Sequence, residues 1–233
     1  VVFCKEIFGG TGMNIFNPAL VARAFLFFSY PTSMSGDKVW VAGEQVLGLG
    51  YALPDATTMA TPLGEAAANL TPSASLCDMV WGFIPGSIGE TSVVAIALGA
   101  LILLVTQIAS WRTMLSVFVG GILVAVLFNM ANIEGNAVAQ MPWYEHLATG
   151  GFCFGAVFMA TDPVTSARTE NGKFVYGFLI GALAILIRVL NPGYPEGMMF
   201  AILMMNMFAP AIDYCFVQSN VRRRMHRVKS LNK

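Results

Sequence analysis

Apolar residues in this chain gather in long segments separated by short polar stretches, a pattern typical of membrane helices. A helix crosses the hydrocarbon core with about 20 apolar residues, within a range of roughly 17–25. The second, third, fifth and sixth segments meet that range, and the first and fourth are marginal. We therefore predict an all-α integral membrane protein with about five to six transmembrane or half-membrane helices. The six segments are residues 14–30, 93–109, 114–131, 147–161, 174–190 and 198–217.

The composition supports a lipid-facing surface. Of the 233 residues, 56% are hydrophobic and only 11% are charged, whereas soluble domains carry about 25% charged residues. The net charge of zero does not indicate a nucleic-acid partner. The chain begins with Val1 and Val2, so we expect a piece of a longer protein that lacks its N-terminal part. The four cysteines are widely spaced without a CxxC pair, so we expect apolar packing residues and no metal site.

Two of the apolar segments are short and interrupted by glycine. Gly9-Gly10-Thr11-Gly12 and Asn17-Pro18 frame the start of the first, and Gly150-Gly151 and Asp162-Pro163 bound the fourth. Short interrupted segments in the two halves of a chain indicate discontinuous helices that line a site near the middle of the membrane. The alternative is that Gly and Pro are simply common in membrane helices. We favour the site and expect these segments to be partners.

Charge distribution predicts the orientation. Because basic residues accumulate on the cytoplasmic side, the basic tail, residues 218–233, is expected there. If the chain changes sides at each apolar segment, counting back from this tail puts Arg112, Arg168 and Lys173 on the cytoplasmic side as well. The long stretch 31–91 then lies outside, with six acidic residues against the single cation Lys38. We accordingly divide the chain into a Gly-rich loop and first broken helix (1–30), an extracytoplasmic loop (31–91), a helical bundle (92–217) and a cytoplasmic tail (218–233).

The clearest chemical motif is residues 55–61, Asp-Ala-Thr-Thr-Met-Ala-Thr. It resembles the motif Asp-Gly-x-Ser/Thr-Gly-Ala-Thr, at whose last threonine bacterial transferases attach FMN through a phosphoester. The chain matches at Asp55, Thr58, Ala60 and Thr61, and departs at both glycines, Ala56 and Met59. A threonine hydroxyl on an exposed loop can attack a phosphate. The competing interpretation is a helix cap, because Thr61-Pro62 followed by Glu65 is typical of a helix start.

Motifs along the whole chain are similar to those of one membrane family. The segments around residues 8–12, 14–28, 84–90, 109–112, 159–164 and 191–199 resemble NqrB, a membrane component of the Na⁺-translocating NADH:quinone reductases. RnfD of the Rnf complex is a relative with the same arrangement. The resemblance implies a bacterial inner-membrane protein, here the C-terminal half or more. It also implies partner proteins of the same complex that carry flavins and iron–sulfur clusters.

The same resemblance implies roles for individual residues. Thr61 would carry covalent FMN on the outer face, and Asn14 and Asn17 would hold a non-covalent riboflavin. An amide suits this role because it both donates and accepts hydrogen bonds. Without the resemblance, Asn17-Pro18 is a turn or helix start. Asp213 would belong to a sodium pathway, although a structural ion pair with a tail cation explains an embedded acid equally well.

Other charged residues in or near the apolar segments need partners. Arg23 lies in the middle of the first segment, where a flavin or quinone oxygen is one possible partner. Arg188 lies late in the fifth segment, and we expect it to extend to the outer interface. We interpret Asp162 and Glu196, each beside a proline, as caps or loop ligands in preference to proton carriers.

These features together predict a flavin-carrying component of a translocase. Electrons would pass from covalent FMN to riboflavin and then to ubiquinone, coupled to Na⁺ translocation, while the cofactors supply the chemistry. The alternatives are a component of an Rnf-type ferredoxin:NAD oxidoreductase, a small-solute or ion transporter, and a purely structural assembly protein. Flavin content separates the transporter from the others, and loss of quinone reduction on replacing Asn14 and Asn17 separates the structural protein.

Overall fold

The computed structural model describes residues 1–30, 61–70, 74–87, 89–131, 133, 135–191 and 196–231. The motif residues Asp55, Thr58 and Ala60 lie outside this part of the chain, whereas Thr61 lies within it. The described residues form helices connected by turns, which confirms the all-α fold. The elements are η1(Glu6–Phe8), α1(Pro18–Ser29), α3(Pro62–Ala67), α4(Leu76–Trp81), α5(Val93–Val105), α6(Trp111–Ala131), α7(Ala137–Gln140), α8(Trp143–Ala148), α9(Phe152–Phe154), the π-helical turn η3(Gly155–Met159), α10(Glu170–Leu190) and α11(Met198–Leu231).

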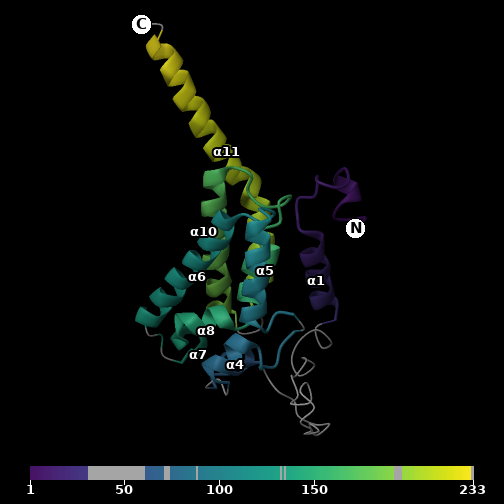
Figure 1. Ribbon diagram of the computed structural model, residues 1–233, viewed down its shortest axis with the longest axis vertical. Coiled ribbons are helices and arrows are strands. Elements are labelled where there is room, and N and C mark those ends of the chain that lie inside the picture. Colours follow the sequence, from purple (N-terminus) through teal and green to yellow (C-terminus); the bar gives the residue numbers. More distant parts are fainter. Residues whose placement is uncertain are drawn as a thin grey trace.

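In the described part of the chain, three helices are long and apolar enough to cross a membrane: α6, α10 and the part of α11 from Met198 to Arg227. They correspond to the third, fifth and sixth predicted segments. Helices α6 and α10 begin at the same end of the bundle, where Arg112 forms an ion pair with Glu170 and Trp111 stacks edge-on against Phe174. Helix α11 runs in the opposite direction beside α10 (Figure 1).

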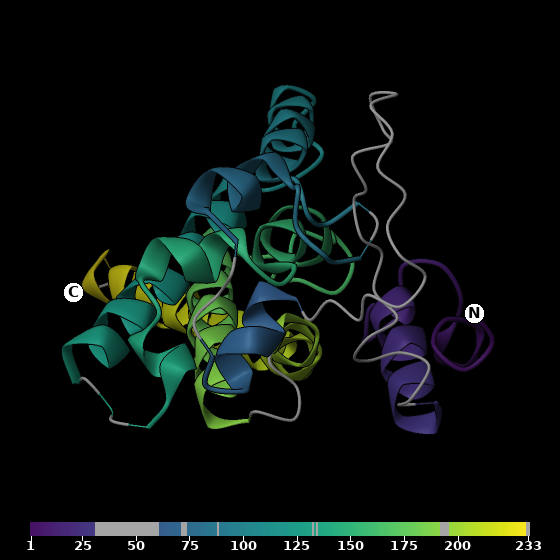
Figure 2. The ribbon, with the colours of Figure 1, turned by 90° about the horizontal axis from the view of Figure 1, so that it is seen from below.

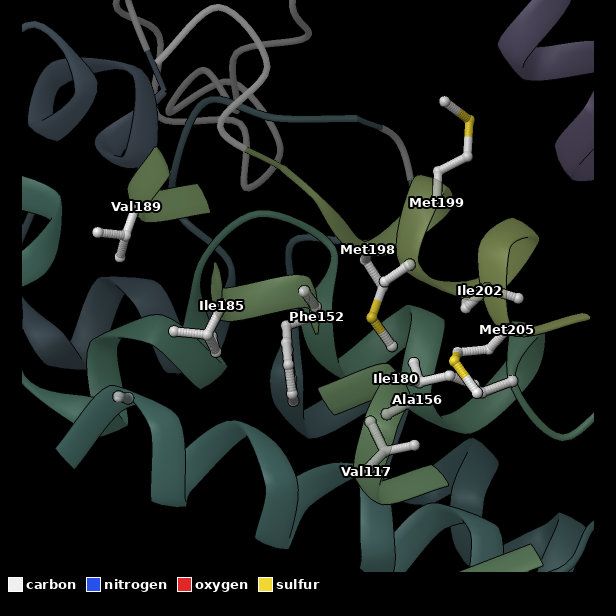
Figure 3. Close-up of a cluster of buried hydrophobic side chains, with 14 of the residues drawn as sticks. Val117, Phe152, Ala156, Ile180, Ile185, Val189, Met198, Met199, Ile202 and Met205 are labelled. Atoms are coloured by element: carbon white, nitrogen blue, oxygen red, sulfur yellow. The ribbon is translucent and has the colours of Figure 1, made fainter. Parts of the chain in front are cut away.

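The core lies where these three helices meet the broken fourth segment. Figure 3 shows Val117 of α6, Phe152 of α9, Ile180 of α10 and Met198 of α11 directed into one apolar cluster. All four side chains are buried. The cluster therefore holds the fourth segment rigidly against the long helices, because buried apolar surface is the main stabilising contribution to packing.

The second apolar segment is shorter as a helix than predicted. Helix α5 ends at Val105 after 13 residues, which is about 20 Å of rise against a hydrocarbon core of about 30 Å. Its end is defined by Thr106, whose hydroxyl donates to the Ile102 carbonyl (2.8 Å), and by Gln107, whose φ of 56° is left-handed. We expected residues 93–109 to be long enough to span the membrane. This is wrong, because the helix covers only Val93–Val105.

Helix α11 continues beyond the predicted end of the sixth segment. It extends without interruption through the basic residues to Leu231, 34 residues in all, and contains Pro210. At 1.5 Å per residue this is about 51 Å, longer than the hydrocarbon core. The basic stretch therefore projects beyond the bundle as a helix (Figure 1).

The fourth segment is a broken helix, as predicted. Helix α8 ends at Ala148, and the chain then reverses through Gly150 and Gly151, both with left-handed backbone (φ 58° and 60°). This conformation strains residues with a Cβ, so glycine is required at the turn. A short helical stretch, α9 followed by η3, then leads to the turn at Thr161 and Asp162.

The loops sort into two groups at opposite ends of the bundle. Residues 106–110, the turn 162–169 and the basic half of α11 lie at one end, and α4, α7 and α8 lie at the other (Figure 1). Helix α1 stands at one side of the bundle in both views (Figures 1 and 2). The basic residues Arg112, Arg168 and Lys173 share the first end, which is the grouping that the charge pattern predicted.

Candidate functional site

A cavity of about 510 Å³ lies between the first and fourth apolar segments, near the basic end of the bundle. One wall is the turn before α1, with Asn14 and Asn17, and the opposite wall is the end of the fourth segment, with Asp162. The end of α5 supplies Leu103. The volume falls within the roughly 300–1,000 Å³ typical of small-molecule sites. The first and fourth segments are therefore partners around one cavity. Its remaining lining residues are Val1, Lys5, Thr11, Gly12, Pro18, Ala19, Ile108, Ala109, Phe158, Thr161, Pro163 and Val164.

Asn14, one of the lining residues, has an unpaired amide oxygen. Its Nδ2 donates to the carbonyl of Phe16 (3.2 Å). Its Oδ1 is buried and has no hydrogen-bond partner among the described residues. Only 6% of the residue is exposed. Because a buried acceptor without a donor is costly, this oxygen fits a ligand that offers an N–H or O–H group.

Asn17 caps α1, the short helix of the first segment. Its Oδ1 accepts from the backbone N–H of Ala19 (3.0 Å), and Pro18 follows at the first helical position. The interpretation of Asn17-Pro18 as a helix start is thus confirmed. The Asn17 Nδ2 donors are not used by the cap, so the side chain retains hydrogen-bonding capacity toward the cavity that it lines.

Thr61 lies away from this cavity, toward the end of the molecule that carries α4, α7 and α8. It is the N-cap of α3, and its Oγ1 accepts from the Gly64 N–H (3.1 Å). The helix-cap interpretation is confirmed, and it is compatible with esterification because the cap uses the oxygen and leaves the hydroxyl hydrogen replaceable. Leu63 of α3 packs directly over Gly150, the turn that begins the broken fourth segment.

Arg188 organises that turn through its guanidinium group. It donates to the carbonyls of His146 (2.6 Å), Thr149 (3.0 Å), Gly150 (2.7 Å) and Glu196 (3.1 Å). None of its surface is exposed. The expectation that Arg188 extends to the outer interface is therefore wrong, because converging carbonyls at the broken turn replace solvent. Burial, and then the charge of Arg188, lower the pKa of His146 to about 3, so its imidazole stays neutral.

A group of charges joins α1 to the start of α11. Arg23 pairs with Glu196 (2.8 Å), which supplies the partner that a cation in an apolar segment requires. A flavin or quinone contact through Arg23 stays a prediction. Glu90 lies close to both residues, and a Cβ on Gly151 would be 2.9 Å from its Oε2. Burial raises the pKa of Glu90, the Glu196 carboxylate raises it further, and Arg23 partly offsets both.

Asp213 bonds to the loop before α10. Its carboxylate accepts from the backbone N–H groups of Arg168 (2.7 Å) and Thr169 (2.9 Å) and from the Thr169 hydroxyl (2.6 Å). Through these contacts Asp213 anchors α11 to the 162–169 turn. This role differs from the expected ion pair with a cation of the tail. A sodium pathway through Asp213 stays a prediction.

Asp162 bonds to the loop that follows it at the cavity edge. Its two carboxylate oxygens accept from the Val164 N–H (3.3 Å) and the Thr165 hydroxyl (2.8 Å). No described helix begins here, so Asp162 has the loop-ligand role of the two that were expected. Glu196, in contrast, combines its ion pair with Arg23 and a hydrogen bond from Arg188 to its backbone carbonyl.

The fold defines an all-α integral membrane protein in which the short helix α1 and the broken fourth segment line one cavity. The chain belongs to the NQR2, RnfD, RnfE family, whose model matches residues 1–222. It is 54% identical over 227 residues to NqrB of the Na(+)-translocating NADH-quinone reductase from Chromohalobacter salexigens, covering 97% of this chain and 54% of the relative. The NqrB of Klebsiella pneumoniae is 51% identical over 229 residues, with 97% and 55% covered. The chain thus spans about half the length of the curated relatives it matches.

Proposed function

We propose that this chain is the flavin-carrying part of an NqrB in a Na⁺-translocating NADH:quinone reductase of a bacterial inner membrane. Thr61, within the motif of Asp55, Thr58 and Ala60, carries covalent FMN on the outer face. Asn14 and Asn17 hold riboflavin near the cytoplasmic face. Bound flavins supply the electron transfer toward ubiquinone. The chain's relatives support the assignment, since their name includes both Na⁺ translocation and quinone reduction.

One observation carries the proposal: the two candidate sites adjoin the two ends of one short broken helix. Leu63, two residues after Thr61, contacts Gly150 before α9, and Asp162 after η3 lines the cavity with Asn14 and Asn17. The helical stretch Phe152–Met159 between them is about 12 Å long. One short helical stretch therefore connects the two candidate flavin sites, which suits electron transfer from one bound flavin to the other.

The cavity residues fit a riboflavin. The buried, unpaired Oδ1 of Asn14 can accept from a ring N–H, and Asn17 retains two amide donors for ring acceptors. The apolar wall formed by Leu103 and Phe158 suits an aromatic ring system. The role of these residues is to bind and orient the ring and to exclude water around it.

The proposal also assigns orientation and coupling. The end with Arg112, Arg168, Lys173 and the basic half of α11 faces the cytoplasm, in accordance with the distribution of basic residues. Other proteins of the complex supply NADH oxidation and iron–sulfur chemistry, and Na⁺ crosses beside the electron path.

The test is covalent flavin content in the full-length protein purified from its membrane. Thr61→Ala and Thr61→Asn are expected to abolish in-gel flavin fluorescence and the added mass of an FMN phosphoester. Asparagine is as good an N-cap as threonine, so Thr61→Asn keeps the start of α3 and isolates loss of the hydroxyl. Thr57→Ala removes a neighbouring hydroxyl and should leave the fluorescence unchanged.

Two outcomes would contradict the proposal. Fluorescence that survives in Thr61→Asn would exclude Thr61 as the sole attachment point. An intact-mass spectrum of active wild-type protein that shows only the bare polypeptide would remove the flavin-carrying role, and would favour the transporter alternative.

A further inference from the structure

Behind the cavity wall, a buried polar pair connects two of the long helices to the turn before α1. Tyr176 of α10 and Asn206 of α11 are each only 1% exposed. The Tyr176 hydroxyl and the Asn206 amide lie 2.7 Å apart. Buried polar groups in apolar helices are expensive unless they are bonded, so such a pair has a defined role in the fold or the site.

The remaining contacts of Asn206 reach the candidate flavin site. With its amide nitrogen facing Tyr176, that nitrogen also donates to the Ile202 carbonyl (3.3 Å). The amide oxygen then accepts from the backbone N–H of Asn17 (3.3 Å). This N–H belongs to the residue that caps α1, whose side chain lines the cavity. Asn206 therefore fixes the position of the capping turn relative to α11.

Tyr176 holds the Asn206 amide from the α10 side. Its hydroxyl bonds to that amide, so one amide joins α10, α11 and the turn before α1. Asp162 lines the same cavity from the end of the fourth segment. Displacement of Asn206 or Tyr176 would therefore move the turn that carries Asn14 and Asn17.

We propose that Asn206 and Tyr176 are positioning residues for the non-covalent flavin: they hold the Asn14–Asn17 turn against α10 and α11, in the place that the ring requires. This inference rests on the proposed function, because it assumes that Asn14 and Asn17 bind flavin. Neither residue needs to touch the flavin itself. Their effect is on the affinity and the reduction potential of that flavin, while the flavin on Thr61 is unaffected.

The test compares two flavins in the same full-length membrane protein. Asn206→Leu removes all the bonds of the amide, and Tyr176→Phe removes only the hydroxyl. The affinity for added riboflavin, measured after extraction and rebinding, should fall about tenfold or more in Asn206→Leu, as expected for loss of roughly one buried hydrogen bond. In Tyr176→Phe the midpoint potential of the retained non-covalent flavin should shift, while covalent fluorescence and potential stay unchanged.

The matched controls are the same two substitutions, Asn to Leu and Tyr to Phe, at positions that do not line the cavity. Asn129→Leu removes an α6 amide that donates to the Met141 carbonyl (2.6 Å), and Tyr144→Phe removes a hydroxyl from a side chain that is 41% exposed. Neither lines the cavity, so neither should change riboflavin affinity or potential. If Asn206→Leu does not accumulate as folded protein, Tyr176→Phe decides the question by its potential.

The outcomes separate this inference from the proposed function. Unchanged riboflavin binding in Asn14→Leu and Asn17→Leu would overturn the flavin site, and the inference with it. Loss of riboflavin in those variants, with wild-type affinity and potential in Asn206→Leu and Tyr176→Phe, would overturn the inference alone. Equal shifts in the midpoint potentials of both flavins in Tyr176→Phe would also overturn it, because that result indicates a change that is not confined to the non-covalent site.

Discussion

Gly181 of α10 lies directly against the backbone carbonyl of Val117 in α6, so close that a Cβ on Gly181 would overlap the carbonyl oxygen. The contact is reciprocal: a Cβ on Gly120 of α6 would overlap the carbonyl of Phe178 in α10. Gly177, one turn before Gly181, meets Ser116 in the same way. Backbone approach of this kind requires small residues on both helices, and it fixes how α10 presents Tyr176 and Arg188 to the rest of the molecule.

We predict that Gly181→Ala separates α6 from α10 and destabilises the protein. Overpacking of a well-packed contact typically costs about 1–3 kcal/mol, and here the obstructing atoms are backbone. Thermal unfolding in detergent measures the change. Val175→Ile adds a methylene to a side chain of α10 that is 41% exposed, and it should leave the unfolding temperature close to that of wild type. A wild-type midpoint for Gly181→Ala would mean that the helices can separate without penalty.

Much of this fold follows from local pattern, because helix length and small-residue spacing are properties of neighbouring residues. The long apolar runs predicted α6, α10 and α11, and the glycines at 150 and 151 predicted the break in the fourth segment. Gly177 and Gly181 have the GxxxG spacing that suits a close helix contact. The early end of α5 was not evident, because the apolar run continues to Ala109 while the backbone turns at Gln107.

The contacts within the site were harder to predict, because they join residues far apart in sequence. Nothing near Arg188 indicates that the carbonyls of His146, Thr149 and Gly150 converge on it, so its burial could not be foreseen. Asn206 did carry a signal, since an amide inside an apolar segment needs a partner. That signal identifies a residue to examine, but it does not identify Asn17 and Tyr176 as its neighbours.

We predict that Arg188→Met destabilises the protein by about 3 kcal/mol or more, because several buried carbonyls would be left without a donor at a cost of about 1–3 kcal/mol each. The carbonyls of His146, Thr149 and Gly150 would lose their donor. Proteolysis and hydrogen exchange around residues 149–151 should increase with the loss of thermal stability. Arg112→Met, at an ion pair with Glu170 on a partly exposed surface, is the control and should cost at most about 1 kcal/mol. Equal effects of the two substitutions would contradict the role of Arg188 as a clamp.

We predict that Asp213→Asn and Thr169→Val both loosen the turn 162–169, which Asp213 joins to α11. Asparagine replaces one acceptor oxygen with a donor that faces an N–H group, and valine removes the hydroxyl that bonds to Asp213. Hydrogen exchange of residues 165–172 should rise in both variants. Sodium dependence of turnover separates the two interpretations of Asp213. If Asp213→Asn alone changes the sodium response, the cation pathway is supported; if both change it alike, the anchor explains the effect.

We predict that Glu90→Gln is more stable than wild type at neutral pH and that this difference shrinks toward zero in acid. Burial, followed by the nearby Glu196, raises the folded-state pKa of Glu90 above its ordinary value of 4.5. The folded protein therefore binds this proton more tightly than the unfolded chain. Wild-type stability falls relative to the glutamine variant as pH rises from 4.5 through that raised pKa.

Unfolding midpoints in detergent across this pH range test the prediction. Glu6→Gln removes a negative charge from the exposed N-terminal segment and serves as the control for net charge. Arg23 and Ser87 both favour the ionised form of Glu90 and partly oppose the shift. A glutamine variant that is less stable than wild type at every pH would show that these two contacts outweigh burial. In that case Glu90, together with Arg23 and Glu196, would hold α1 to the bundle as a fully ionised cluster.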